Sequence, residues 1–166
     1  MDHVPNLGRR NFLQGRTVPA SGIPPPGASK DGLQACTGCA ACVEACPTGI
    51  ISLVRGYPAL DFTIGECTFC GECANACPEP VFSGETPRRF AHAVAISSSC
   101  FAKSGIACQS CRDICPEQAI RFTPRIGGPF VPELDEDACS ACGACIGVCP
   151  ASAIGVSERG KADIHA

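Results

Sequence analysis

The chain has 166 residues, which allows one domain or two very small ones. It has no Trp, one Tyr and eight Phe against 18 Gly and 15 Pro, so an apolar core alone would barely offset the conformational entropy lost on folding. The 16 cysteines are the obvious means of holding such a chain together. The net charge is −3 at pH 7, and neither half has the dense basic run expected of a nucleic-acid-binding protein.

An arginine pair near the start resembles the beginning of a twin-arginine export signal. Arg9 and Arg10 are followed by Phe12 and Leu13, but the next residues are rich in Pro and Gly. They do not supply the long apolar stretch that such a signal needs. No other stretch approaches the ~18 consecutive apolar residues of a membrane helix. We therefore expect a cytoplasmic protein with no membrane span, in which residues 1–35 form a mobile N-terminal arm.

Four cysteine quartets follow the arm, and a proline comes directly after each of them. The quartets are Cys36, Cys39, Cys42, Cys46; Cys67, Cys70, Cys73, Cys77; Cys100, Cys108, Cys111, Cys115; and Cys139, Cys142, Cys145, Cys149. The distance from Cys36 to Cys67 is 31 positions, and so is the distance from Cys108 to Cys139. The chain therefore consists of a duplicated pair of repeats.

Two β-hairpins are predicted between the quartets. In the first, Gly49–Val54 and Tyr57–Phe62 flank Arg55-Gly56, a pair that suits a tight turn. In the second, Ala119–Pro124 and Phe130–Leu134 flank a glycine-containing loop. The quartets leave room for only a helical turn or two, which the following proline ends. Because proline biases the preceding residue toward an extended backbone, the last thiol of each quartet should point away from the first three.

The cysteine spacing C-x2-C-x2-C-x3-C-P is typical of bacterial ferredoxin-type [4Fe-4S] sites, in which the fourth cysteine binds the other cluster of a pair. Three quartets match this spacing to the residue. Structural zinc usually takes two separate C-x2-C pairs, and a disulfide scaffold needs an oxidising compartment, so both alternatives fit less well. The sequence predicts a small α+β chain of tandem 2[4Fe-4S] ferredoxin-like modules with short hairpins and short helices. The predicted parts are the arm 1–35, a first dicluster module 36–80, a linker 81–96, a second dicluster module 97–156 and a tail 157–166.

The repeat period favours cluster pairing within each half of the chain. The predicted ligand sets are Cys36, Cys39, Cys42, Cys77 (cluster 1); Cys67, Cys70, Cys73, Cys46 (cluster 2); Cys100, Cys108, Cys111, Cys149 (cluster 3); and Cys139, Cys142, Cys145, Cys115 (cluster 4). A nested arrangement, with the outer quartets paired and the inner quartets paired, stays open. Cys100 lies eight positions before Cys108 instead of three. Either the inserted loop returns it to the same corner of the cluster, or the third site is a three-iron or labile one.

Several motifs make the chain resemble the NapF family of ferredoxin-type accessory proteins of the periplasmic nitrate reductase system. They are the arginine pair, "GYPALDF", "CTFCGECANACPEPVFS", "CFAKSGIACQSCRDICPEQAIRFTP" and "CSACGACIGVCPASAI". The resemblance implies a cytoplasmic protein with [4Fe-4S] clusters. It also implies a partner, the precursor of the molybdenum-containing nitrate reductase catalytic subunit, which the protein helps to mature before export. On this view Arg9, Arg10, Phe12 and Leu13 dock on the partner or its export machinery; the alternative is a solvated basic arm.

Two functions therefore compete, and they would use the same cysteines. The first is maturation of a molybdenum enzyme precursor by binding it and supplying electrons or cluster components. The second is a general polyferredoxin that relays electrons between an unknown donor and a reductase. An enzyme is not expected, because the chain shows no catalytic constellation and His3, His92 and His165 stand alone.

Overall fold

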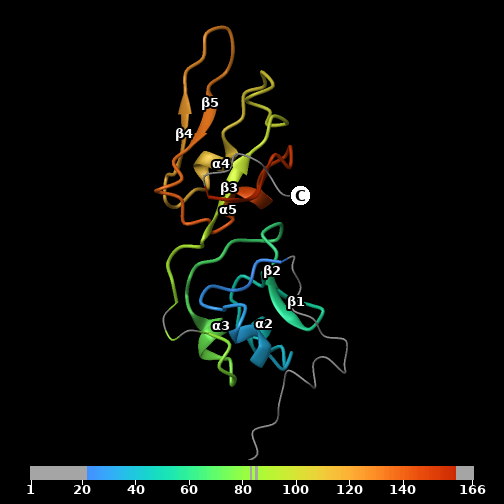
Figure 1. The fold of residues 1–166 in the computed structure, drawn as a ribbon. Coiled ribbons are helices and arrows are strands. Elements are labelled where there is room, and N and C mark those ends of the chain that lie inside the picture. Colours follow the sequence, from blue (N-terminus) through green and yellow to red (C-terminus); the bar gives the residue numbers. More distant parts are fainter. Residues whose placement is uncertain (1–21, 83, 85, 160–166) are drawn as a thin grey trace, which may run out of the picture. The chain divides into compact units, whose positions relative to one another are not determined.

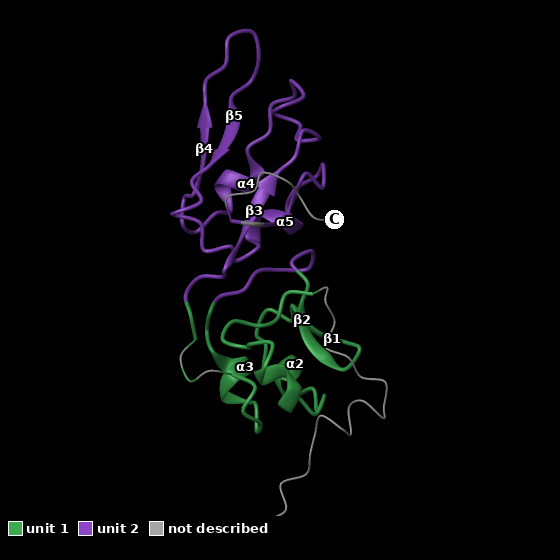
Figure 2. Cartoon of the chain, viewed as in Figure 1, with its two compact units in different colours: residues 1–61, 69–87 green, residues 62–68, 88–166 purple. Residues whose placement is uncertain are grey.

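The computed structural model describes residues 22–82, 84 and 86–159 (Figure 1). The predicted partner-binding residues Arg9, Arg10, Phe12 and Leu13 lie outside the described residues. The chain divides into two compact units (Figure 2). Unit 1 runs up to Asp61 and continues over Phe69–Pro87, while unit 2 consists of Phe62–Thr68 and the chain from Arg88 onward. The sequence-based division placed residues 62–68 in the first module, whereas the contacts of this segment assign it to unit 2.

Unit 1 combines short helical turns with one hairpin. The elements are the 3-10 turn η1 (Gly32–Ala35), the helices α2 (Ala41–Glu44) and α3 (Glu72–Asn75), and the strands β1 (Ile51–Val54) and β2 (Tyr57–Leu60). β1 and β2 are antiparallel, with Val54 opposite Tyr57 next to the turn. In that turn Arg55 and Gly56 have φ of 52° and 85°. Positive φ at both positions is what a type I′ hairpin turn requires, and the first predicted hairpin is confirmed.

The apolar core of unit 1 is small and lies beside cysteines. Leu33, Tyr57 and Val81 are buried together, and the partly buried Cys36 and Cys77 pack against them. η1 and the hairpin thus bring apolar side chains to two cysteines from different quartets. Ile50 and Ile51 are buried as well. Burial of so few large side chains stabilises a fold only modestly, so we expect groups bound by the cysteines to contribute to the stability of unit 1.

Unit 2 contains two antiparallel strand pairs and two helical turns. The elements are the strands β3 (His92–Ile96), β4 (Ile120–Thr123), β5 (Val131–Leu134) and β6 (Ile154–Glu158), and the helices α4 (Ser110–Asp113) and α5 (Ala144–Gly147). β4 pairs with β5, with Ile120 opposite Leu134, which confirms the second predicted hairpin. β3 pairs with β6, with Ile96 opposite Ile154. This second pair was not predicted; we expected a linker over 81–96, and the structure has a strand at its end.

The rings of Phe62, Phe90 and His92 form an aromatic cluster in unit 2. The rings of Phe90 and His92 stack at a centroid distance of 4.8 Å, and Phe62 meets Phe90 edge-on at 6.0 Å. Phe62 also packs under Gly143, where a Cβ atom would lie 2.1 Å from the ring carbon Cδ1. Segment 62–68 therefore closes against the loop that carries the last quartet.

In the described part of the chain the helices are single turns and each sheet has two strands. This arrangement of a few short helices and small antiparallel sheets is consistent with tandem ferredoxin-like modules. None of these helices is long and apolar enough to cross a membrane.

Candidate metal centres

The third cysteine of every quartet occupies the same place in its helical turn. Cys42, Cys73, Cys111 and Cys145 are each the second residue of a four-residue helix, and all four are buried. Each helix ends before the fourth cysteine of its quartet, as the proline after that cysteine predicts. The chain thus separates the fourth thiol from the other three.

One cavity in unit 1 collects cysteines from two quartets. Cys36, Cys39 and Cys42 line it together with Cys77, and its volume is about 340 Å³ including space open to solvent. Burial, followed by the charges of the Cys36 and Cys77 thiolates, raises the pKa of the Cys42 thiol to about 11. Crowded thiolates of this kind are what a positively charged iron site neutralises.

A cavity in unit 2 collects cysteines from the third and fourth quartets. Its cysteines are Cys100, Cys108, Cys111 and Cys149, and its volume is about 340 Å³. The other lining residues are mostly apolar. Among them are Phe122 from β4 and Phe101 from the insert, the seven residues 101–107 between Cys100 and Cys108. Burial and then the Cys100 thiolate raise the pKa of Cys111 to about 11. The structure therefore brings Cys100 to the same cavity as the other three members of its predicted set.

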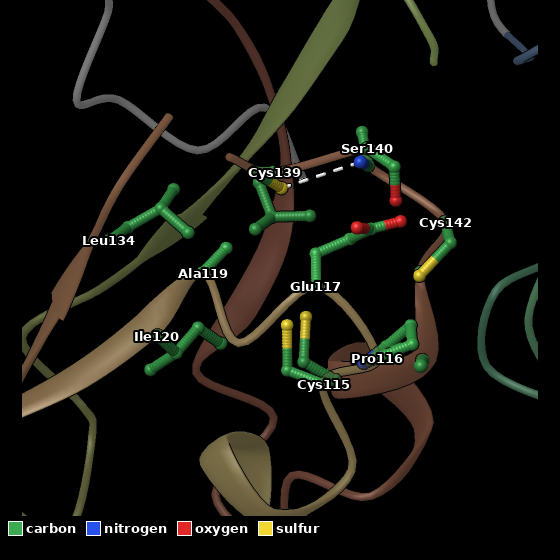
Figure 3. A pocket seen from close by; sticks show the side chains of 14 residues that line it. Cys115, Pro116, Glu117, Ala119, Ile120, Leu134, Cys139, Ser140 and Cys142 are labelled. Atoms are coloured by element: carbon green, nitrogen blue, oxygen red, sulfur yellow. Dashed lines mark hydrogen bonds between the residues drawn. The ribbon is translucent and has the colours of Figure 1, made fainter. Parts of the chain in front are cut away.

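A second cavity in unit 2, of about 310 Å³, combines the same two quartets in the opposite way, with one cysteine from the third and three from the fourth (Figure 3). Cys115 from the third quartet lines it with Cys139, Cys142 and Cys145 from the fourth. The thiols of Cys115, Cys139 and Cys142 face the same space in Figure 3. The N–H of Ala141 donates to the Cys139 sulfur at 3.3 Å, and burial followed by the Cys142 and Cys139 thiolates raises the pKa of Cys145 to about 12.

For the remaining predicted set, that of cluster 2, the structure shows only the surroundings of individual members. The set is Cys46, Cys67, Cys70 and Cys73. The Cys46 sulfur lies 3.5 Å from the Thr48 hydroxyl oxygen. Burial acts to raise the pKa of Cys46, but hydrogen bonds from Thr48 and from the following backbone N–H groups bring it below its ordinary value. The N–H of Cys67 donates to the Cys142 carbonyl at 2.9 Å within unit 2. The assignment of these four cysteines to one cluster stays a prediction.

The insert of the third quartet forms a closed helical turn. The N–H of Ile106 donates to the Phe101 carbonyl at 2.8 Å, and the N–H of Gly105 donates to the Ala102 carbonyl at 3.3 Å. Gly105 has a φ of 94°, in the left-handed region that favours glycine. This pair of bonds around a left-handed residue is a Schellman motif, which ends a helix and reverses the chain. The reversal explains why the cysteines on both sides of a seven-residue insert line one cavity.

Two carboxylates beside the cavities were not predicted from the sequence. Glu117 lines the cavity of Figure 3 with its carboxylate toward Ser140 and Cys142, and Glu79 lines the cavity of unit 1. Each lies two positions after a cysteine that contributes to the other quartet's cavity, namely Cys115 and Cys77. The signal in the sequence is this fixed offset. A cysteine that lines a cavity places the residue two positions later beside the same cavity.

The donor atoms fit iron–sulfur clusters. All 16 cysteines are free thiols, and each of the three cavities offers four of them, the ligands that such clusters use. Among the described residues, no group of three or more His, Cys, Asp or Glu meets the geometry of a site for a single metal ion. His92 stacks on Phe90 in the aromatic cluster, while His3 and His165 lie outside the described residues.

Comparison with known proteins agrees with this chemistry. The model of the 4Fe-4S dicluster domain matches residues 35–81 and 106–153. The ferredoxin-type protein NapF of Haemophilus influenzae is 40% identical over 171 residues, covering 93% of this chain and 96% of that protein. NapF of Escherichia coli strain K12 is 41% identical over 153 residues, covering 90% and 93%. A component of an ion-translocating oxidoreductase complex from Methanosarcina acetivorans is 36% identical over 125 residues, covering 72% of this chain and 46% of that protein. The chain therefore belongs to the NapF family of ferredoxin-type iron–sulfur proteins.

Proposed function

We propose that the chain binds four [4Fe-4S] clusters, with the first quartet paired to the second and the third to the fourth. The observation that carries this proposal is the exchange of fourth cysteines. Cys77 lines the cavity of the first quartet, Cys149 that of the third and Cys115 that of the fourth. Cys46 would complete the exchange at the cluster of Cys67, Cys70 and Cys73. When bound, [4Fe-4S] clusters supply one-electron transfer.

The residues around the cavities suit such a role because they hold the thiols and limit water. Ile120, Leu134 and Val94 wall the cavity of Figure 3, and Ile96, Phe122 and Ile154 wall the other cavity of unit 2. Backbone N–H donors reach the Cys139 and Cys149 sulfurs, both at 3.3 Å. Hydrogen bonds to the sulfurs, net charge and solvent exposure are the protein's means of setting a cluster's reduction potential.

The biological role we propose is maturation of the periplasmic nitrate reductase catalytic subunit in the cytoplasm, before its export. The protein would bind the unexported molybdenum-containing precursor and supply electrons or cluster components to it. Support comes from the similarity to NapF proteins over at least nine-tenths of the chain. The arm residues Arg9, Arg10, Phe12 and Leu13 are the proposed contact with the partner or its export machinery.

The second candidate is a general electron-transfer polyferredoxin. It is favoured by the similarity to a component of an ion-translocating oxidoreductase complex, which covers 72% of the chain. In this role the same cysteines would relay electrons between a donor and a reductase, without recognition of a precursor.

An anaerobic pull-down with the tagged full chain from its host's cytosol separates the two candidates. Enrichment of the unexported reductase precursor, identified by mass spectrometry, supports maturation. Recovery of a redox donor or membrane oxidoreductase without the precursor supports the relay. The double variant Arg9→Ala, Arg10→Ala tests the arm: weaker recovery of the precursor supports docking, and unchanged recovery removes that idea.

A further inference from the structure

The β4–β5 hairpin of unit 2 is tied to the insert of the third quartet by one side chain. Arg125 lies in the hairpin loop between Thr123, the last residue of β4, and Val131, the first residue of β5. Its Nη1 donates to the Lys103 carbonyl at 3.2 Å, and its Nη2 donates to the Ala102 carbonyl at 3.4 Å. A single guanidinium therefore spans from the hairpin loop to two successive carbonyls of the insert.

These carbonyls need an external donor because of where they lie. The insert is one helical turn, and the last carbonyls of a helix have no partner within it. The Schellman bond from Gly105 uses the Ala102 carbonyl only in part, since a carbonyl has two lone pairs. Arginine side chains near a helix end commonly satisfy such groups. Arg125 thus completes the turn that reverses the chain between Cys100 and Cys108.

Two further features show that the contact is built into the fold. Gly128 leaves room for the guanidinium, because a Cβ atom there would lie 2.5 Å from Nη2 and 2.7 Å from Nε of Arg125. The side chain of Lys103, whose carbonyl accepts from Arg125, donates in turn to the Ile96 carbonyl at the end of β3. The insert is therefore held from the hairpin loop and from β3.

We propose that Arg125 is a positioning residue for Cys100: by holding the insert, it keeps the Cys100 thiol at the cavity that Cys108, Cys111 and Cys149 line. This inference rests on the proposed function, in which those four thiols bind the third cluster. It adds that the longer spacing of the third quartet works only with the hairpin loop as a support. The other three quartets have the short spacing and need no such support.

The test compares three single variants of the full chain. Arg125→Ala removes the guanidinium, and Gly128→Ala displaces it while leaving Arg125 in the sequence. Arg121→Ala is the matched control: this arginine lies on β4 of the same hairpin, its side chain is 76% exposed, and its ion pair is with Asp135 at 4.0 Å. The double variant Arg125→Ala, Gly128→Ala shows whether the two changes act through one contact.

The first readout is iron content after anaerobic reconstitution, together with the rate of iron loss to a chelator. Wild type and Arg121→Ala should hold about 16 iron atoms, and Arg125→Ala and Gly128→Ala about 12 or a three-iron signal in its place. Where Arg125→Ala or Gly128→Ala retains its iron, the chelator should remove it about fivefold faster than from the wild type, which is the effect of one hydrogen bond. The double variant should lose iron no faster than Arg125→Ala. Wild-type iron content and loss rate in both single variants would overturn the proposal.

The second readout is amide hydrogen exchange, which does not depend on counting clusters. The Gly105 and Ile106 amides should exchange faster in Arg125→Ala, while the β3–β6 amides keep their protection. Unchanged exchange at Gly105 and Ile106 would overturn the proposal, and so would an equal loss of protection in β3–β6, which indicates global destabilisation. If wild-type protein bound no iron, the proposed function would fail, and these amides would still report whether Arg125 holds the insert.

Discussion

Cys77 lies with Cys42 around one cavity, although Cys73 is the cysteine closest to it in the sequence. α3 ends at Asn75, Ala76 keeps helical dihedral angles, and Pro78 then favours an extended backbone at Cys77. The thiol therefore leaves its own quartet and joins the preceding one. The same relationship holds between Cys149 and the third quartet, and Cys115 makes the reverse exchange with the fourth.

Double cysteine variants test this pairing. Cys36→Ser and Cys77→Ser should each remove or damage one cluster, and the double variant should lose no more iron than either single change, because both residues serve the same cluster. Cys36→Ser with Cys73→Ser should lose about eight iron atoms, four from each of two clusters. Iron counts after anaerobic reconstitution distinguish these cases. Additive loss in the Cys36, Cys77 pair would favour a nested arrangement.

Gly143 should tolerate substitution less well than other left-handed glycines of unit 2. Gly143→Ala places a Cβ 2.1 Å from Phe62 at a φ of 87°, so it incurs both overpacking and backbone strain. We expect the free energy of unfolding to fall by about 2–5 kcal/mol. Gly127→Ala is the control, since Gly127 has a φ of 77° with nothing within 4 Å of its Cβ position, and should cost about 1–2 kcal/mol. Equal losses in anaerobic denaturant unfolding would contradict the close packing of Phe62 on this loop.

Glu117 should lower the reduction potential of the cluster proposed at the cavity of Figure 3. Its carboxylate lies beside Cys142 at that cavity, and a negative charge disfavours the addition of an electron. In Glu117→Gln the potential should rise by roughly 40 mV, which corresponds to about 1 kcal/mol for one electron in a water-exposed setting. Glu133→Gln on β5 is a control, because Glu133 instead accepts a hydrogen bond from Thr123 at 3.1 Å. Potentiometric titration followed by electron paramagnetic resonance measures both; equal shifts would show that Glu117 acts only through net charge.

His92 should make stability depend on pH. Burial, aided by the positive charge of Arg159, lowers the pKa of His92 to about 4 against a hydrogen bond with the Ala141 backbone, and its Nε2 is buried without a hydrogen-bond partner. The unfolded chain, with a pKa near 6.5, binds more protons between pH 4 and 6.5. The stability of the folded chain therefore does not suffer from His92 above pH 6.5, where the ring is neutral in both states. As the pH falls from 6.5 toward 4, the free energy of unfolding decreases, because only the unfolded chain takes up the proton.

The variant His92→Leu isolates this effect because leucine cannot titrate. Its free energy of unfolding, measured anaerobically in denaturant, should change less between pH 6.5 and 4 than that of the wild type. Parallel pH profiles for the two proteins would show that His92 is not buried as a neutral ring.

The local parts of this fold were predictable because their signals are adjacent in the sequence. Arg55-Gly56 stands between two short apolar runs, and each proline after a quartet marks the end of a helical turn. The β3–β6 pair was missed because its strands come from opposite ends of unit 2, and no turn residues connect them. Long-range pairing of short strands depends on tertiary packing, which the sequence pattern does not encode locally.

The sites divide in the same way. Cysteine spacing predicted the thiols, but the supporting residues act through space. Arg125 reaches the insert from a hairpin loop, and Phe62 reaches Gly143 from a segment that precedes the second quartet. Glu117 and Glu79 did have a local signal, since each lies two positions after a cysteine, Cys115 or Cys77.

The proposed cluster content is tested most directly by the iron and inorganic sulfide content of the full chain after anaerobic purification, with Mössbauer spectroscopy to identify the cluster type. Four [4Fe-4S] clusters predict about 16 iron and 16 sulfide atoms per chain, with spectra of cubane clusters. A count near 12 or below, or tightly bound zinc in place of iron, would contradict it.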